Sequence, residues 1–295
     1  MALRRELSLA AARTVLLAAA MTVSAVGLGP PPLAADGAAA LEVVPGSVVQ
    51  GEAVRIPVHT VAAPTVLLVG DRAVPLHRVM GGYQAFVGTS PLTRPGVVRV
   101  EAFFRGQDSA TARARFLVRA GTFGVRRLQV PPGLMDPALA ERERRRVAQA
   151  TSRPLPAPLW RGVFLRPVAG PVTSTYGVRS VYNGVFRGHH LGVDLRAAAG
   201  TPVRAANDGV VTLAEALPLS GRTVILDHGV GIFTTYQHLA AVVVHPGQRV
   251  RRGHVLGQVG STGLSTAPHL HWGMRIHGVR VDPLLWTTPG PLTEP

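Results

Sequence analysis

Short stretches of alternating apolar and polar residues, separated by turn residues, occupy the chain from residue 41 to about residue 130. The clearest stretches are 53–58, 65–69, 96–104 and 112–118. Turn residues recur between them, for instance at Pro45-Gly46 and Pro95-Gly96. Alternation with a period of two predicts half-buried strands, and short strands at even spacing are typical of antiparallel sandwiches. We therefore predict a small immunoglobulin-like β-sandwich over 41–130.

A helix and a Pro-rich linker are predicted to follow the sandwich, over 131–162. Asp136 followed by Pro137 is a typical N-cap with Pro at the first helical position, and good helix formers continue over 138–150. The charged run at 141–146 within this helix is interpreted as a solvated face. Residues 151–158 are rich in Pro, and we expect them to form an extended linker.

A second β-rich region is predicted over 163–288, followed by a short tail at 289–295. Its first notable string, 188–195, alternates two kinds of residue. The aliphatic residues are Leu191, Val193 and Leu195, and the residues between them are His190, Gly192 and Asp194. Successive side chains of a strand point to opposite faces, so His190 and Asp194 are expected to share one face.

Two further strings carry histidines on apolar backgrounds. In 268–276, His269 and His271 are expected to point one way and the apolar residues the other. In 234–239, His238 is expected to share the face of Tyr236. Each string alone is weak evidence, because buried histidines bonded to backbone are common, but three such strings indicate one site. The other histidines of this region are interpreted as turn or surface residues: His228, His245, His254 and His277.

The first forty residues, 1–40, have the pattern of an export signal. Arg4, Arg5 and Arg13 precede an apolar run over 14–28, which Gly and Pro residues then interrupt. The sequence leaves open a cleaved signal peptide, with small residues at two candidate cleavage sites, and an uncleaved signal anchor. No later stretch approaches the ~18 apolar residues that a membrane span needs. We predict an exported protein of the periplasm, the cell envelope or the extracellular space.

Composition narrows the chemistry that the chain can perform. The absence of Cys excludes disulfides, a cysteine nucleophile and thiolate zinc ligands, so a metal site must use His and carboxylate. The 31 basic residues, all Arg, exceed the 16 acidic ones and give a net charge of +15. This charge is spread along the chain, and only 5% of the residues are aromatic, so nucleic acid is not an expected partner. An anionic cell-wall polymer fits the charge, and a monomer is expected.

The three strings resemble, in their order and spacing, the signature of lysostaphin-type zinc metallopeptidases. They are His190-Leu-Gly-Val-Asp194, Tyr236-Gln-His238 and His269-Leu-His271. Segments between and beside them also resemble that family, so that the likeness covers about 165–285. The resemblance implies an antiparallel β-sheet peptidase domain with a duplicated hybrid motif. Residues 41–150 resemble, more loosely, the β-rich amino-terminal extensions of some exported members.

The resemblance further implies one zinc ion per chain, with His190, Asp194 and His271 as its ligands. His238 and His269 would form the catalytic pair, and the sequence leaves open which is the base and which the acid. Three protein ligands leave a fourth tetrahedral position for water, which is the arrangement of catalytic rather than structural zinc. Asn183 is a further candidate, which could mask the metal in a latent form.

The sequence thus indicates an exported zinc endopeptidase that hydrolyses peptide bonds in peptidoglycan stem peptides or cross-links, in wall remodelling or lysis. The alternative is a non-catalytic relative of the same fold that binds the wall or activates an amidase. All five site positions are filled, which favours the enzyme. A purely structural adhesion protein would not account for the His and Asp pattern. The 41–130 region is expected to cover the catalytic domain or to supply wall affinity.

Overall fold

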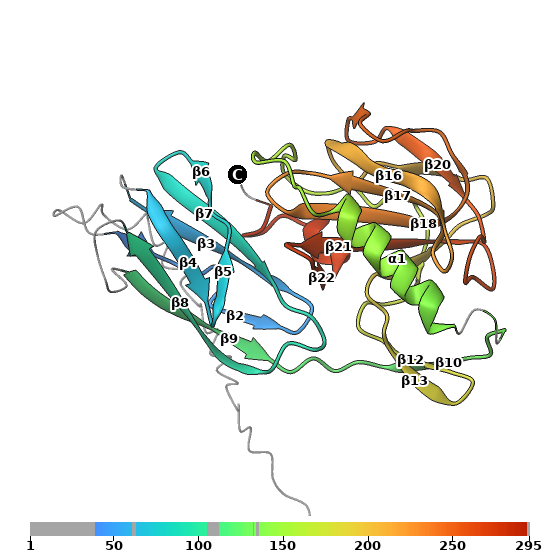
Figure 1. Ribbon diagram of the computed structural model, residues 1–295, viewed down its shortest axis with the longest axis horizontal. Coiled ribbons are helices and arrows are strands. Elements are labelled where there is room, and N and C mark those ends of the chain that lie inside the picture. The colour runs from blue at the N-terminus through green and yellow to red at the C-terminus, as the bar shows by residue number, and fades with distance from the viewer. Residues whose placement is uncertain (1–38, 61–62, 105–111, 132, 134–135, 294–295) are drawn as a thin grey trace, which may run out of the picture. The chain divides into compact units, whose positions relative to one another are not determined.

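The computed structural model describes residues 39–293, except 61–62, 105–111, 132 and 134–135. The described chain is mostly β, as predicted (Figure 1), with helix α1 between its two β regions and the short 3-10 helix η2 after its last strand. The export signal predicted over 1–40 lies outside the described residues, apart from its last two positions. Among the residues that are described, none of the helices is long and apolar enough to cross a membrane.

The first β region forms two sheets around one core. Its strands are β1 (Ala40–Leu41), β2 (Ser47–Val49), β3 (Ala53–His59), β4 (Pro64–Val69), β5 (Arg72–Val74), β6 (His77–Val79), β7 (Gly82–Gly88), β8 (Gly96–Phe104) and β9 (Ala112–Arg119). One sheet has the order β2-β9-β8-β4-β5 and the other β1-β3-β7-β6. Ile56, Val100 and Phe116 belong to a buried cluster that draws on both sheets, as in a sandwich. The immunoglobulin-like topology stays a prediction.

Residues 120–162 join the first β region to the second and are called the connector here. The connector begins with strand β10 (Val125–Leu128), which pairs with the second β region. Strand β12 (Arg179–Tyr182) lies between β10 and β13 (Val185–His189) in a three-stranded sheet. β10 pairs parallel with β12, and β12 pairs antiparallel with β13. A strand that precedes the peptidase-like region in sequence is therefore hydrogen-bonded to the hairpin that leads into His190.

Helix α1 (Pro137–Ala150) follows β10 and packs on the large, ten-stranded sheet of the second β region. The side chain of Asp136 caps it by accepting a hydrogen bond from the Ala138 N–H at 2.8 Å, the start that the sequence indicates. Val147 packs on buried residues of the sheet, among them Ile225 and Phe233. The interpretation of 141–146 as a solvated face is wrong in part, because some of its side chains face the protein.

Two charged residues of that run bind the large sheet and a loop beside it. Arg146 donates from Nε and Nη2 to the two carboxylate oxygens of Glu215, at 2.7 and 2.9 Å. The carboxylate of Glu143 accepts hydrogen bonds from the backbone of Leu219 and Ser220. The Pro-rich segment after the helix is also attached, since the Leu155 N–H donates to Asp227 Oδ2 at 2.8 Å.

The second β region is dominated by a ten-stranded sheet. Its strands are β11 (Val172–Ser174), β14 (Val193–Arg196), β15 (Pro202–Arg204), β16 (Gly209–Leu217), β17 (Gly221–Asp227), β18 (Ile232–Val242), β19 (Arg249–Val250), β20 (Val255–Val259), β21 (His269–Ile276) and β22 (Val279–Val281), and η2 (Pro283–Trp286) follows. The main path runs β11-β14-β21-β18-β17-β16-β19. Leu270, Trp272 and Met274 of β21 point from one face of this sheet into a cluster of buried apolar residues, which we call the main core. The opposite face of the sheet carries α1 and the side chains of Asp194 and His271.

Candidate metal centre

Strands β14 and β21 place a carboxylate directly beside an imidazole. The two strands pair antiparallel, with Asp194 opposite His271 and Val193 opposite Trp272. Residues directly opposite each other on paired strands project from the same face. The apolar members of both strands are fully buried in the main core, so alternation sends Asp194 and His271 together to the other face.

His190 reaches the same face from a different local structure than predicted. Strand β13 ends at His189 and β14 begins at Val193, so the single strand expected over 188–195 is wrong. His190 lies in the turn between them, anchored by its N–H, which donates to Val178 O at 2.7 Å. Gly192 is required in this turn, because a Cβ there would lie 2.6 Å from both His271 Nε2 and Trp272 O.

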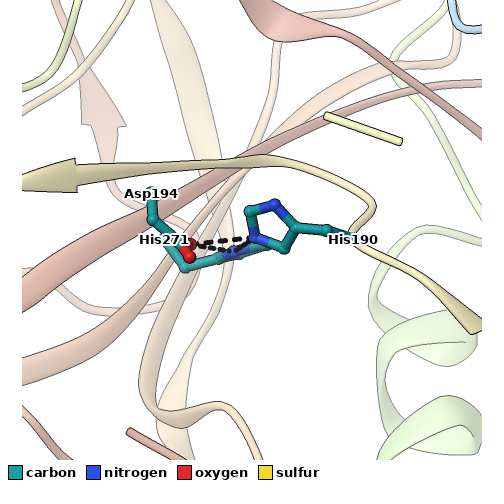
Figure 2. Close-up of side chains that lie close together, drawn as sticks. All are labelled: His190, Asp194 and His271. Atoms are coloured by element: carbon teal, nitrogen blue, oxygen red, sulfur yellow. Dashed lines mark hydrogen bonds and ion pairs between the residues drawn. The ribbon is translucent and has the colours of Figure 1, made fainter. Parts of the chain in front are cut away.

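The three side chains converge through one atom each (Figure 2). His190 Nε2, His271 Nδ1 and Asp194 Oδ1 lie 2.9 Å from one another in all three pairs. Tetrahedral bonds of about 2.0 Å to a zinc ion require ligand atoms about 3.3 Å apart, so the donors fit after spreading by a few tenths of an ångström. All three residues are buried. Two imidazole nitrogens and a carboxylate oxygen are a donor set that suits zinc.

The electrostatics of the cluster favour the protonation states that bind a metal. Burial alone raises the pKa of Asp194, but hydrogen bonds with His190 and His271 outweigh it and hold that pKa far below its ordinary value. Burial lowers the pKa of His271 to about 3, against the opposing hydrogen bond with Asp194. Asp194 is therefore a carboxylate and His271 a neutral imidazole at neutral pH, as metal ligation requires.

His238 comes to this face by interrupting the alternation of β18. Tyr236 lies opposite Trp272 and is fully buried in the main core, so the prediction that His238 shares its face is wrong. His238 has φ +63°, a left-handed conformation that breaks the alternation and brings its ring to 4.9 Å from the ring of His269. Burial lowers the pKa of His238 to about 4.

The two outer histidines are each fixed through Nδ1 by a backbone carbonyl. His238 Nδ1 lies 2.8 Å from Thr262 O, and His269 Nδ1 lies 2.8 Å from Ala267 O. An Nδ1–H that donates to a carbonyl leaves Nε2 as the atom that can accept or deliver a proton. His269 Nε2 lies 3.8 Å from Asp194 Oδ1, so all five residues named from the sequence gather in one place.

Comparison with known proteins places these residues in a family. Residues 188–283 match the family model of peptidase family M23. These residues form an M23 peptidase domain. All five site residues fall inside it, whereas β10 and α1 precede it.

Two known relatives of the M23 domain are named as endopeptidases. The "DD-carboxypeptidase/endopeptidase Mpg" of Neisseria gonorrhoeae is 46% identical over 102 residues, covering 35% of this chain and 24% of that protein. The "Peptidoglycan DD-endopeptidase ShyA" of Vibrio cholerae is 38% identical over 100 residues, covering 34% of this chain and 23% of that protein. The chain therefore spans about a quarter of the length of these curated relatives.

A solved structure is similar over most of the described chain. The crystal structure of an M23-assigned protein from Pseudomonas aeruginosa is 29% identical, with a TM-score of 0.63. The similarity covers 81% of this chain and 94% of that one. The likeness thus extends well beyond the 188–283 segment that matches the family.

Two residues outside the M23 domain bind at its site, one directly and the other through the backbone beside it, and neither was identified from the sequence. Arg126 of β10 donates from Nη1 to Asp194 Oδ2 at 3.2 Å. Glu143 of α1 holds the backbone of Ser220, whose carbonyl accepts the His238 N–H at 2.9 Å. Both lie in charged stretches that match no motif. Their position in the sequence, shortly before the domain, is the feature that could have pointed to a role at the site.

Two sequence interpretations of single residues are corrected. The Asn183 side chain, suggested as a mask of the metal, instead binds the connector, with Oδ1 accepting from the Val130 N–H at 2.9 Å and Nδ2 donating to Val130 O at 2.8 Å. His228 is fully buried rather than a turn or surface residue. Its Nδ1 lies 2.6 Å from Asp208 O, and its Nε2 lies 2.7 Å from Thr234 Oγ1.

Proposed function

We propose that this protein is an exported zinc metalloendopeptidase that hydrolyses peptide bonds in peptidoglycan stem peptides or cross-links. The observation that carries the proposal is the triangle of His190, Asp194 and His271, whose donor atoms are 2.9 Å apart with two further histidines beside them. The name of the relative from Vibrio cholerae supplies the substrate class, and the name of the relative from Neisseria gonorrhoeae agrees with endopeptidase activity. One zinc ion per chain, bound by these three residues, is the cofactor of this proposal.

The donor set suits catalysis better than structural support. A zinc ion held by these three residues would lower the pKa of a water molecule to about 7 and would polarise a carbonyl. Three protein ligands leave room for water and substrate, whereas structural zinc sites use four. Asp194 is already a carboxylate and His271 is already a neutral ring at neutral pH. Neither group therefore has to change its net charge before it binds a cation.

His238 and His269 handle protons in this proposal. Because a carbonyl holds Nδ1 of each ring, each Nε2 is oriented and available. One ring takes the proton of the attacking water, and an imidazolium stabilises the oxyanion or protonates the leaving amine. The burial that lowers the pKa of His238 to about 4 keeps that ring neutral at pH 7, so it can accept a proton.

The wider assignment rests on sequence features outside the M23 domain. The leader pattern at 1–40 supports export to the periplasm, the cell envelope or the extracellular space. Peptidoglycan is the proposed partner, because the spread positive charge suits an anionic wall polymer. A monomer suffices, since one chain supplies all five site residues.

Digestion of isolated peptidoglycan tests the proposal against a wall-binding or amidase-activating role. The wild-type protein is expected to release fragments whose masses correspond to cleaved peptide bonds, and Asp194→Ala to release none. His245→Ala, which changes an exposed histidine outside the site, is the matched control and should digest at the wild-type rate. Binding of the wild-type protein to the wall without any cleavage would reject the enzyme and favour the non-catalytic role.

A further inference from the structure

We propose that Arg126 is a positioning residue for the carboxylate of Asp194, supplied to the M23 domain by the connector that precedes it. The inference rests on the proposed function, because it concerns the same metal site. It adds a residue that lies outside the 188–283 segment and 68 positions before its partner in sequence.

Three hydrogen bonds hold the guanidinium of Arg126 in place. Its Nη1 donates to Asp194 Oδ2 at 3.2 Å and to Ser174 Oγ at 3.3 Å, and its Nε donates to Ser180 Oγ at 2.9 Å. A planar guanidinium that is bonded along more than one edge has a fixed plane, unlike a lysine ammonium. Its side chain is 26% exposed, so the group lies at the border of the site and not in open solvent.

The backbone of β10 delivers Arg126 to this position. In the parallel pairing of β10 with β12, Arg126 lies opposite Ser180, the residue that its Nε contacts. The Gly124 carbonyl accepts the Arg179 N–H at 2.8 Å, and the Asn183 side chain bonds both backbone groups of Val130. These bonds tie both ends of β10 to the β12–β13 hairpin. Alternation along the strand turns the neighbouring side chain, that of Arg127, out to solvent.

The contact divides the two oxygens of Asp194 between two tasks. Oδ1 lies 2.9 Å from His190 Nε2 and from His271 Nδ1, while Oδ2 is bonded by Arg126. The guanidinium thereby fixes the rotation of the carboxylate and leaves one oxygen facing the two imidazoles. Groups that orient metal ligands in this way typically contribute 10–100-fold to metal affinity.

The positive charge of Arg126 acts in the opposite direction, because it repels a bound cation. Solvent at the partly exposed guanidinium screens that repulsion, whereas the orientation of Asp194 depends on direct contact. Orientation therefore outweighs repulsion in this proposal, and removal of the side chain is expected to weaken metal binding. If charge repulsion dominated, the same change would strengthen it.

The test is the zinc affinity of full-length variants, measured by competition with a chromophoric chelator. Arg126→Ala should bind zinc about 10–100-fold more weakly than the wild-type protein. Arg127→Ala, the matched control on the same strand, should stay within about twofold, since its side chain faces solvent and its loss removes the same charge. Arg126→Lys keeps the charge but lacks the fork that spans three acceptors, so it should resemble Arg126→Ala more than the wild type.

A spectroscopic measurement separates positioning from a general loss of stability. With saturating cobalt(II) in place of zinc, Arg126→Ala should show altered d–d absorption bands, because its carboxylate is no longer held. Zinc affinity of Arg126→Ala equal to or tighter than that of the wild type would overturn the inference. If Arg126→Ala fails to fold by circular dichroism, Arg126→Lys is judged by the same criteria. A wild-type protein without zinc affinity would instead refute the proposed function.

Discussion

Glu143 of α1 offers a sharp test of whether the connector supports the M23 domain. Its carboxylate accepts hydrogen bonds from the N–H groups of Leu219 and Ser220, at 2.8 and 3.1 Å, and from the Ser220 hydroxyl. The Ser220 carbonyl in turn accepts the N–H of His238 at 2.9 Å, where the backbone is left-handed. The substitution Glu143→Gln keeps the size of the side chain and removes its charge.

The expected cost follows from these contacts. Hydrogen bonds to a charged group contribute about 1.5–3 kcal/mol each and neutral ones about 0.5–1.5 kcal/mol, and a glutamine can keep the three contacts only as neutral hydrogen bonds, with the Ser220 hydroxyl as an acceptor. Glu143 is half-buried, so part of the loss is recovered from water, and a net destabilisation of about 2 kcal/mol is expected. For domains of this size, about 2 kcal/mol corresponds to a decrease of about 4–8 °C in melting temperature.

The assay compares the thermal unfolding of Glu143→Gln with that of Glu141→Gln. Glu141 lies on the same helix and pairs with Arg144 and Arg145 at the surface, so its substitution should cost less than about 0.5 kcal/mol. Glu143→Gln should also hydrolyse peptidoglycan more slowly at unchanged zinc content, because the Ser220 carbonyl positions His238. Equal melting temperatures for the two variants would refute this reasoning.

Two other predictions concern single histidines. His238→Ala and His269→Ala should each retain zinc and lose about 10²–10⁴-fold in hydrolysis, as for general acid–base groups, and full activity of either variant on isolated peptidoglycan would remove that residue from the mechanism. Burial lowers the pKa of His228 from 6.5 to about 4, against the opposing hydrogen bond to Asp208, so its contribution to stability is complete above pH 6.5 and is lost as the pH falls towards 4. Urea unfolding is expected to show a loss of about 3 kcal/mol over this pH range. The loss should be smaller in His228→Gln, and an equal loss in that variant would contradict the assignment.

The face of the sheet on which His269, His271 and Asp194 lie could be predicted, because period-two alternation along a strand is a local property. His269, His271 and Asp194 alternate with residues that are buried in the main core, and the structure places all three on the opposite face. The helix beginning at Pro137 could be predicted for a similar reason, since its capping residue lies next to it in sequence.

The remaining features depend on contacts that alternation does not encode. His190 lies in a turn, and His238 reverses its side by a left-handed φ, which residues other than Gly adopt only rarely. Arg126 and Glu143 act on partners 68 and 77 positions away, so their roles come from the pairing of β10 with β12 and the packing of α1. His228 appeared to be a turn residue because its burial depends on the segments that cover it.

The most direct measurement for this account is the zinc content of the purified protein, determined by elemental analysis per mole of chain. The wild-type protein is predicted to hold about one zinc ion, in keeping with the one cluster of three candidate ligands among the described residues. The triple variant His190→Ala, Asp194→Ala, His271→Ala should retain its β-rich circular dichroism spectrum and hold none. A wild-type protein that binds no zinc, or a triple variant with undiminished zinc, would contradict the assignment of these residues as the metal centre.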